Sequence, residues 1–352
     1  MVQAFSPITL GLTAASLAAS AIGVWISIRL AHRAGVLDVP NERSSHTVPT
    51  PRMGGVPMVA ADVLAFGCWA LLAAGDVFSL KGVPSSIFFA LAMSILGFWD
   101  DIFGLSPLAR FLFQIFIVLI FLWAWAGLFP GISLGGVVIP QFLWIMVGAF
   151  WIVWMVNLYN FMDGIDGLAG GEAAVASLFF FLLFARYEES GWAAANLFLA
   201  AASIGFLVHN WPPARVFMGD AGSAFLGAFF GMQSVVAAIT TPIPFPVLVL
   251  PFSNFILDTT FTLFRRIWRG EKWYTAHRSH YYQRMTDLGI SHRKVTLIEL
   301  FFVAGGCLAA AGYLVFGSIG RTAVVASVFT GAVACALRVN QEERDWRRPG
   351  GK

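Results

Sequence analysis

Charge is scarce in this sequence. Asp, Glu, Lys and Arg make up 12% of the 352 residues, about half the share that soluble domains carry. Hydrophobic residues make up 58%, and the 34 Phe and 13 Trp suit a lipid-facing surface with aromatic residues at the membrane interfaces. This composition excludes an ordinary soluble domain and predicts an all-α, polytopic membrane protein.

Regular alternation of polar and apolar residues is also lacking. The spans of a transmembrane β-barrel are about ten residues of alternating character, whereas the apolar runs here extend to about twenty residues without alternation. The sequence therefore excludes a β-barrel and favours membrane-spanning helices.

Cysteine is rare, and the first residues carry no basic side chain. Cys68, Cys307 and Cys335 fall inside apolar runs, so we expect small buried side chains without a redox or metal role. Residues 1–7 hold no Lys or Arg, and the apolar run up to Leu30 is too long for the core of a signal peptide. We therefore expect no cleavable signal peptide.

Eleven apolar runs are long enough to cross a bilayer as helices. A proline-rich break at residues 241–246 (TPIPFP) separates the eighth run from the ninth, because a continuous helix does not tolerate it. We place the runs at about 8–30, 54–75, 85–103, 110–128, 141–160, 170–187, 193–210, 223–240, 243–264, 295–317 and 320–338.

The basic residues predict the orientation of these helices. With the N-terminus outside, the outer loops hold only Lys81, Arg186 and Arg321, so 22 minus three leaves nineteen Lys and Arg on the inner side. The positive-inside rule then predicts N-terminus out and C-terminus in, in the plasma (inner) membrane. We expect one integral-membrane domain over residues 1–338 and a charged cytoplasmic tail over residues 339–352.

Four polar runs interrupt the apolar sequence, and this orientation places all four on the cytoplasmic face. In the first run, Asp100 and Asp101 end the third span. Adjacent carboxylates repel each other unless a cation or a basic group lies close. The pair is therefore a candidate metal or phosphate site. The alternative is a solvated helix end.

The second run, residues 157–171 (NLYNFMDGIDGLAGG), has Asn157, Asn160, Asp163 and Asp166 at intervals of three residues. On a helix, that spacing places the four side chains along one side. Carboxylate and amide oxygens are ligands that Mg²⁺ prefers. Because polar groups this close to lipid are costly, the run predicts a metal site, with a glycine-rich polar loop as the alternative.

The third and fourth runs add an aspartate and a basic loop. Asp220, in residues 217–223 (FMGDAGS), lies just before the expected start of the eighth span. It is either a helix cap or a metal ligand, and the backbone N–H groups at such a helix start also favour binding of an anion. His277 and His280 flank Arg278 in the basic loop over 265–294, which indicates phosphate contact more than metal binding. Attraction to anionic lipid headgroups is the alternative reason for the basic loop.

Further polar residues lie outside these runs. Arg43 and Arg52, in the inner loop over residues 41–55, are candidate phosphate contacts or positive-inside anchors. Asp62 and Asp258 lie within predicted spans, where an ionisable side chain is either functional or paired across helices.

Together the motifs resemble the polyprenyl-phosphate N-acetylhexosamine-1-phosphate transferases of glycosyltransferase family 4. The resemblance extends from Arg43 to Arg284. Asp100 and Asp101 match the paired aspartates of the family, residues 157–169 match its NxxNxxDGxDGLA run, and Asp220 matches the aspartate of its GDxGS motif. The resemblance implies that Asp220 and Asn160 are Mg²⁺ ligands and that Asp100, Asp101 and Asp163 are catalytic residues. It also implies a set of substrate-binding residues, namely Asn157, Asp166, Arg52, Arg278 and His280.

The fourth run departs from the family pattern DRxHxHH. Arg278 and His280 are kept, whereas His277 stands where aspartate is usual, and Tyr282 and Gln283 replace later histidines. In this respect the chain resembles the subgroup that starts O-antigen synthesis from N-acetylated 6-deoxyhexose donors of the FucNAc or QuiNAc type. We expect aromatic side chains such as Tyr282 and its neighbour at 281 to pack on the C6 methyl group of such a donor.

The resemblance implies a Mg²⁺-dependent reaction, with Mn²⁺ as a substitute metal. A UDP-linked N-acetylhexosamine, either of the FucNAc or QuiNAc type or GlcNAc, donates its sugar 1-phosphate to undecaprenyl phosphate, and UMP leaves. The product would start O-antigen or another cell-surface polysaccharide. Membrane lipids are expected partners, nucleic acid is not, and homodimerisation is left open.

Other functions are weighed against this one. A phospho-MurNAc-pentapeptide translocase-like enzyme of peptidoglycan synthesis is the alternative within the superfamily. A secondary transporter would place its polar site near the bilayer midplane and would show repeated halves, which this sequence lacks. A CDP-alcohol phosphotransferase would have an Ala-Arg pair soon after its first Asp-Gly, but residues 168–171 (LAGG) follow here.

Overall fold

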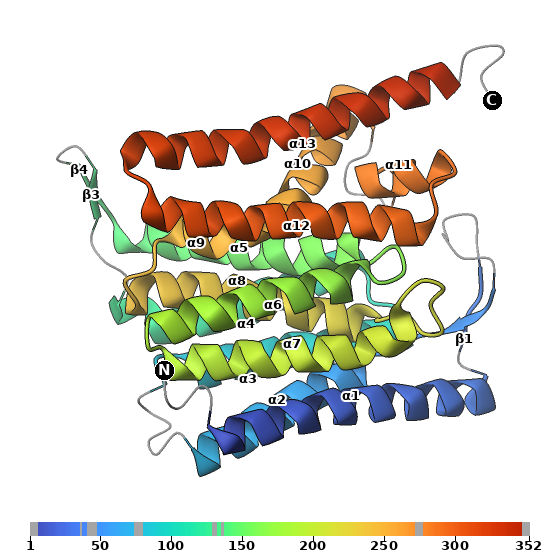
Figure 1. Ribbon diagram of the computed structural model, residues 1–352, viewed down its shortest axis with the longest axis horizontal. Helices are drawn as coiled ribbons and strands as arrows, with labels where there is room; N and C mark the ends of the chain where they lie inside the picture. The colour runs from blue at the N-terminus through green and yellow to red at the C-terminus, as the bar shows by residue number, and fades with distance from the viewer. Residues whose placement is uncertain are drawn as a thin grey trace.

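The computed structural model describes residues 6–35, 37–40, 48–73, 80–128, 132–134, 137–271 and 277–346. The long helices lie side by side, from α1 at one edge to α12 and α13 at the other (Figure 1). Eleven helical segments within the described ranges are long and apolar enough to cross a membrane, which confirms the predicted number.

The bounds of the membrane-spanning helices agree with the predicted spans to within four residues, except that α13 ends eight residues later than predicted. The helices are α1 (Pro7–Ala34), α2 (Gly55–Leu72), α3 (Val83–Phe103), α4 (Pro107–Trp125), α5 (Gln141–Met162), α6 (Leu168–Arg186), α7 (Ser190–Asn210), α8 (Asp220–Thr240), α9 (Phe245–Val249), α10 (Ser253–Trp268), α11 (Tyr281–Asp287), α12 (His292–Val315) and α13 (Ser318–Trp346). Two short 3₁₀ helices are η3 (Ala126–Leu128) and η4 (Leu250–Phe252).

The proline-rich break predicted near residue 241 is present. Helix α8 ends at Thr240, and the chain re-enters the bundle at Phe245 through α9, η4 and α10, which together form one span, Phe245–Trp268. Pro at 242, 244 and 246 removes backbone donors and fixes φ, so the two spans cannot merge into one helix.

The connections contain two small antiparallel hairpins that the all-α prediction missed. Strand β1 (Leu37–Asp38) pairs with β2 (Thr50–Pro51), and β3 (Ile132–Leu134) pairs with β4 (Val137–Ile139). In Figure 1, β1 and α11 lie at one end of the bundle, and the β3–β4 hairpin lies at the opposite end. The end that carries β1 and α11 is the one where the polar runs meet.

Helix α8 is the centre of the bundle and is almost entirely buried. It packs against α3 on one side and α5 on another, while α6 and α7 pack against each other. Inside a membrane the hydrophobic effect does not drive helices together, so close backbone contact at small residues is important. At Gly97 of α3, a Cβ atom would collide with the backbone carbonyl of Asp220, so only glycine lets α3 approach the start of α8.

The cysteine prediction was correct in part. Cys307 is buried and Cys335 is half-buried, but Cys68 is exposed on the surface of α2. In a membrane-spanning helix, a small sulfur-containing side chain is as compatible with lipid as with the protein interior.

Helix α13 continues beyond residue 338, so residues 339–346 of the predicted tail extend this helix. Its last turns contact α11. Arg284 donates through Nη2 to Asn340 Oδ1 and to Glu343 Oε2, each at 2.6 Å, and the Arg284 guanidinium lies 4.6 Å from the centre of the Tyr281 ring. The C-terminal helix thus supports the segment that carries the fourth polar run.

Candidate active site

The paired aspartates at the end of α3 have different partners. Asp100 accepts a hydrogen bond from the backbone N–H of Leu105 at 2.7 Å and pairs with the Arg110 guanidinium at 2.8 Å. Asp101 turns toward the start of α8, where its Oδ2 accepts a hydrogen bond from the N–H of Ala221 at 3.3 Å. Asp100 is therefore held by its own helix end and by α4, whereas Asp101 faces α8.

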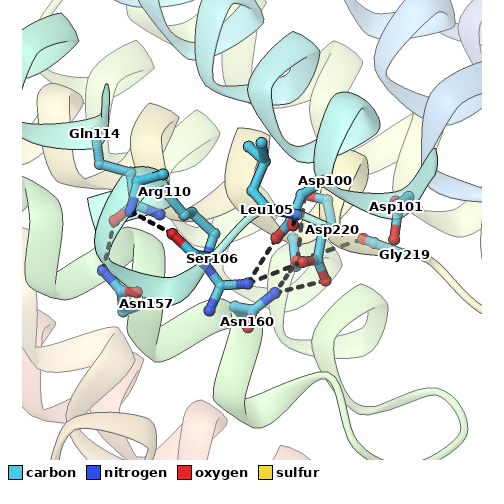
Figure 2. Close-up of polar contacts among 12 residues, drawn as sticks. Asp100, Asp101, Leu105, Ser106, Arg110, Gln114, Asn157, Asn160, Gly219 and Asp220 are labelled. Atoms are coloured by element: carbon cyan, nitrogen blue, oxygen red, sulfur yellow. Dashed lines mark hydrogen bonds and ion pairs between the residues drawn. The ribbon is translucent and has the colours of Figure 1, made fainter. Parts of the chain in front are cut away.

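Arg110 is the basic group that the aspartate pair needs, and the sequence analysis did not identify it. Its Nη1 lies 2.8 Å from Asp100 Oδ2 and 3.2 Å from Asp220 Oδ2, so one guanidinium connects α3, α4 and α8 (Figure 2). The available signal was a basic residue in the first turn of a span, ten residues after Asp100, in a chain with few charges. Positive-inside anchoring explains the same signal, so the sequence alone does not distinguish the two roles.

The two predicted metal ligands lie together. Asn160 of α5 donates through Nδ2 to Asp220 Oδ1 at 2.7 Å (Figure 2). It also donates, more weakly, to Ser223 Oγ at 3.4 Å. Asp220 is the first residue of α8 and not the residue before it, because Gly219, with φ of 76°, occupies the cap position. The positive φ requires glycine at this position, and a Cβ there would also lie only 2.9 Å from Asp101 Oδ2.

The prediction that four side chains line one side of a helix was wrong. Helix α5 ends at Met162, so Asp163 and Asp166 lie in the connection to α6, where Gly residues release the chain from helical geometry. Only Asn157 and Asn160 are on the helix. The spacing of three residues therefore continues across a helix end, and the side chains diverge after it.

Asn157 and Asp166 lie beside the central cluster and support the segments around it. Asn157 donates to Gln114 Oε1 of α4 at 2.8 Å (Figure 2). Asp166 accepts a hydrogen bond from the N–H of Ala214 at 3.0 Å and lies 3.3 Å from His292 Nδ1. Burial raises the pKa of Asp166, but the hydrogen bonds from His292 and Ala214 outweigh burial and lower that pKa below its usual value.

Asp163 lies close to the other carboxylates. Burial, and then the charges of Asp220 and Asp101, raise the pKa of Asp163 well above its usual range, while the charge of Arg52 opposes this rise. A cation close to these carboxylates would relieve the mutual repulsion.

The loop that carries Arg52 is fastened to the segment before α8. Backbone hydrogen bonds of 2.9 Å join Phe217 N to the Pro51 carbonyl, and Gly54 N to the Phe217 carbonyl. Arg52 itself lies 3.4 Å from Asp38 and remains half exposed. These backbone hydrogen bonds bring Arg52 to the aspartate cluster. Arg43 lies outside the described residues.

The fourth run contains one buried histidine and one partly exposed histidine. His280 is only 3% exposed, and its Nδ1 lies 3.1 Å from Asp258 Oδ1. The His277 ring stacks on it with centroids 5.0 Å apart. Burial, and then the charges of His280 and Arg266, lower the pKa of His277 to about 4, so His277 is neutral at neutral pH and supplies no positive charge.

Arg278 is half-buried and forms an ion pair of 3.1 Å with Asp287 at the end of α11. It therefore presents a cation on the same end of the bundle as the other runs. Of the intramembrane aspartates, Asp258 is paired with the fourth run, and Asp62 of α2 is 1% exposed.

The expected contact of two tyrosines with the sugar was wrong. Tyr282 is completely buried, and its hydroxyl donates to the Phe161 carbonyl at 2.8 Å; Tyr281 is 9% exposed and lies under the Arg284 guanidinium. Neither ring is available to pack on a C6 methyl group. The Tyr282 hydroxyl instead holds α11 against the end of α5, and the Tyr281 hydroxyl accepts from Asn340 Nδ2 of α13 at 3.5 Å.

A divalent cation is compatible with the central cluster. Among the described residues, no group of three or more His, Cys, Asp and Glu side chains is arranged to hold a metal alone. Mg²⁺ commonly takes one or two carboxylates and completes its shell with water and substrate phosphates. Asp220 and the amide of Asn160, with Asp163 and Asp101 near them, are oxygen donors of this kind.

The cavities divide into a small polar one at the cluster and larger ones elsewhere. A cavity of about 10 Å³, enough for one water, is lined by Arg110, Gln114, Asn160 and Asp220, among others. Cavities of about 940 and 420 Å³ lie along α13 and contain none of the predicted catalytic residues. The candidate site is the small cavity, because its lining carries the charged groups Arg110 and Asp220.

Comparison with known proteins gives a consistent result. Residues 83–238 match the family described as glycosyl transferase family 4. The chain is 32% identical over 348 residues to the decaprenyl-phosphate N-acetylglucosaminephosphotransferase of Mycolicibacterium smegmatis, covering 90% of this chain and 84% of that protein. It is 29% identical over 287 residues to a probable undecaprenyl-phosphate N-acetylglucosaminyl 1-phosphate transferase of Bacillus subtilis, covering 77% and 75%.

A second group of relatives is named for a different activity. The phospho-N-acetylmuramoyl-pentapeptide-transferase of Lactobacillus gasseri is 30% identical over 273 residues, covering 73% of this chain and 81% of that protein. All of these matches include the segment that carries the aspartate cluster, and they agree with the motifs. The chain therefore belongs to glycosyl transferase family 4, the polyprenyl-phosphate N-acetylhexosamine-1-phosphate transferases.

Proposed function

We propose that this protein transfers N-acetylglucosamine 1-phosphate from UDP-GlcNAc to a polyprenyl phosphate, with release of UMP. The observation that carries the proposal is the contact of Asp220 with both Asn160 and Arg110 at the membrane boundary. This arrangement combines oxygen ligands for a cation with a guanidinium for phosphate at a place that a lipid phosphate can reach.

The reaction requires one bond to form and one to break. A phosphate oxygen of the lipid attacks the β-phosphorus of the UDP-sugar, and the bond from that phosphorus to the oxygen bridging to the α-phosphorus breaks. UMP leaves with the bridging oxygen. Because phosphoryl transfer depends mainly on positioning and charge stabilisation, the residues that matter most are those that fix phosphate oxygens.

The chain supplies these groups from four segments. Arg110 and Arg52 provide positive charge beside the carboxylates, and Asp100 holds Arg110 in place. Asp101 and Asp163, which face Asp220, orient the attacking phosphate or accept its remaining proton. A phosphate monoester is largely ionised near neutral pH, so this proton transfer is a small part of the barrier.

Asp220 and Asn160 would hold Mg²⁺, with Mn²⁺ as a substitute. When bound, the cation supplies charge neutralisation to the donor diphosphate. The chain's own task is then to hold the diphosphate in line with the attacking oxygen, for which Arg278 is a further candidate from the fourth run.

The relatives favour GlcNAc as the sugar. Both the M. smegmatis and the B. subtilis proteins are named for N-acetylglucosamine. The reason for expecting a 6-deoxy donor was an aromatic contact with its methyl group, and Tyr281 and Tyr282 are buried. A role in O-antigen synthesis stays a prediction; the proposal extends only to a cell-envelope glycan.

The first prediction tests the reaction and the donor. Purified protein should move label from UDP-GlcNAc carrying ³²P in the β-phosphate into undecaprenyl phosphate, with one UMP released per labelled lipid. UDP-GlcNAc should react faster than UDP-FucNAc, UDP-QuiNAc or UDP-MurNAc-pentapeptide. Label that leaves as UDP would show transfer of the sugar without its phosphate, and a faster reaction with another donor would overturn the proposed sugar.

The second prediction concerns Asp220 and the cation. Chelation should abolish turnover and Mg²⁺ should restore it, and Asp220→Asn should retain less than a tenth of the activity, a barrier increase above about 1.4 kcal/mol. Asn keeps the shape and removes the charge. Glu188→Gln, at an exposed site after α6, is the matched control and should retain full activity. Full turnover after exhaustive chelation would contradict the metal requirement.

The third prediction concerns Arg110. Arg110→Met should lower kcat/KM about a hundredfold, because it removes a phosphate-stabilising group and leaves Asp100 and Asp220 without their shared cation. Arg110→Lys should lose less, since it keeps the charge but not the planar donors. Arg186→Met, an exposed change at the opposite end of α6, is the control. Near-normal activity of folded Arg110→Met protein would remove Arg110 from the site.

The fourth prediction concerns the membrane side of the site. Ser291 and Ser318 are exposed and lie just beyond the two ends of α12. With the N-terminus outside, an impermeant maleimide applied to intact cells should label Ser318→Cys but not Ser291→Cys, and permeabilised cells should show both. The reverse pattern would place the site outside. His46→Cys, for which we expect the same protection as Ser291→Cys, lies outside the described residues.

A further inference from the structure

Asp258 is a buried carboxylate in α10 that organises the fourth polar run. It is 8% exposed. Its Oδ1 accepts from Tyr281 N at 3.0 Å and lies 3.1 Å from His280 Nδ1, and its Oδ2 accepts from Tyr282 N at 3.1 Å. Thr262 Oγ1 donates to Oδ1 at 3.1 Å. One side chain of a membrane span thus holds three consecutive residues of a distant segment.

The contact with Asp258 fixes how the His280 ring is protonated. An ionised carboxylate only accepts hydrogen bonds, so Nδ1 of His280 carries its proton toward Asp258, and Nε2 is the nitrogen left for another partner. The ring is also held by stacking, since its centroid lies 5.0 Å from that of His277 and 5.9 Å from that of Tyr282, with interplanar angles of 29° and 25°.

The same contact reaches the aspartate cluster through α11. The hydroxyl of Tyr282 donates to the Phe161 carbonyl at the end of α5, two residues before Asp163. The residue after Asp163 is Gly164, where a side chain would collide with the Tyr282 hydroxyl. The position of α11, which Asp258 sets, therefore limits the position of the loop that carries Asp163.

We propose that Asp258 is a positioning residue for the transfer reaction: through His280 and the start of α11 it aligns the fourth run and the Asp163 loop with the donor diphosphate. This role rests on the proposed function, because it is defined by a substrate bound at that site. Asp258 touches no substrate in this arrangement and acts through His280.

A purely structural role makes different predictions from a positioning role. If Asp258 only stabilised the fold, its substitution would lower the amount and thermal stability of the protein, and the remaining folded enzyme would keep its normal KM. If Asp258 positions His280, folded enzyme should bind the donor less well. The neighbouring Glu299 of α12 offers a matched control, because it is also a buried carboxylate. Its Oε2 accepts from Asn254 at 3.2 Å, and among the described residues no hydrogen bond or ion pair joins it to residues 277–280.

The experiment compares Asp258→Asn, His280→Gln, the double variant and Glu299→Gln in purified, monodisperse protein. Asp258→Asn should lower kcat/KM for the UDP-sugar by about tenfold to a hundredfold, the usual effect of removing a group that orients a functional histidine. Most of that loss should be in the donor KM, with the polyprenyl phosphate KM unchanged. The double variant should be no worse than the more damaged single variant, and Glu299→Gln should resemble the parent.

Normal donor KM in folded Asp258→Asn protein, or losses that multiply in the double variant, would overturn the proposal. A second measurement does not depend on activity. In a ¹⁵N-histidine spectrum of the full chain, whose six His are assigned with the help of His280→Gln, the His280 signal should show the Nδ1–H form in the parent and change in Asp258→Asn. An unchanged His280 signal would contradict the positioning role, whichever donor the parent uses. Turnover of UDP-GlcNAc by the parent tests the proposed function separately.

Discussion

The sharing of Arg110 between Asp100 and Asp220 is the interaction on which the rest of the site depends. Two carboxylates from different helices meet at a membrane boundary, where water screens their repulsion only partly. The guanidinium lies within 3.2 Å of both and offers several donors in a fixed plane. Without such a counter-charge, α3 and α8 could not bring their acidic ends together, and the close contact that Gly97 allows would be unfavourable.

Around this ion pair, the site is built from ends of helices and not from their sides. Asp100 and Asp101 end α3, Asn160 lies in the last turn of α5, and Asp220 begins α8. This placement resolves the conflict between charge and lipid, because polar side chains lie where the helices leave the membrane and unpaired backbone groups assist them. The apolar middle of each helix is left to pack or to face lipid.

The positions where sequence reasoning failed have two causes. Periodicity extended the helix of Asn157 and Asn160 to Asp163 and Asp166, but a helix end, which spacing alone does not reveal, separates them. Arg110 looked like an ordinary membrane anchor, and Tyr281 and Tyr282 looked like ligand contacts. For Arg110 and the two tyrosines, the deciding fact was a contact between segments distant in the chain, such as Arg110 with Asp220 and the Tyr282 hydroxyl with the end of α5.

By itself, the sequence determined the class of protein, the eleven spans, the break before Phe245 and the motifs that identify the family, because hydrophobic run length, proline and motif chemistry are local properties. Only the tertiary structure decided which polar groups meet. It brought Asp220 to Asn160 and Arg110, sent Asn157 and Asp166 to supporting positions, and buried His280 against Asp258. These pairings depend on how helices far apart in sequence pack together, and no local pattern encodes that packing.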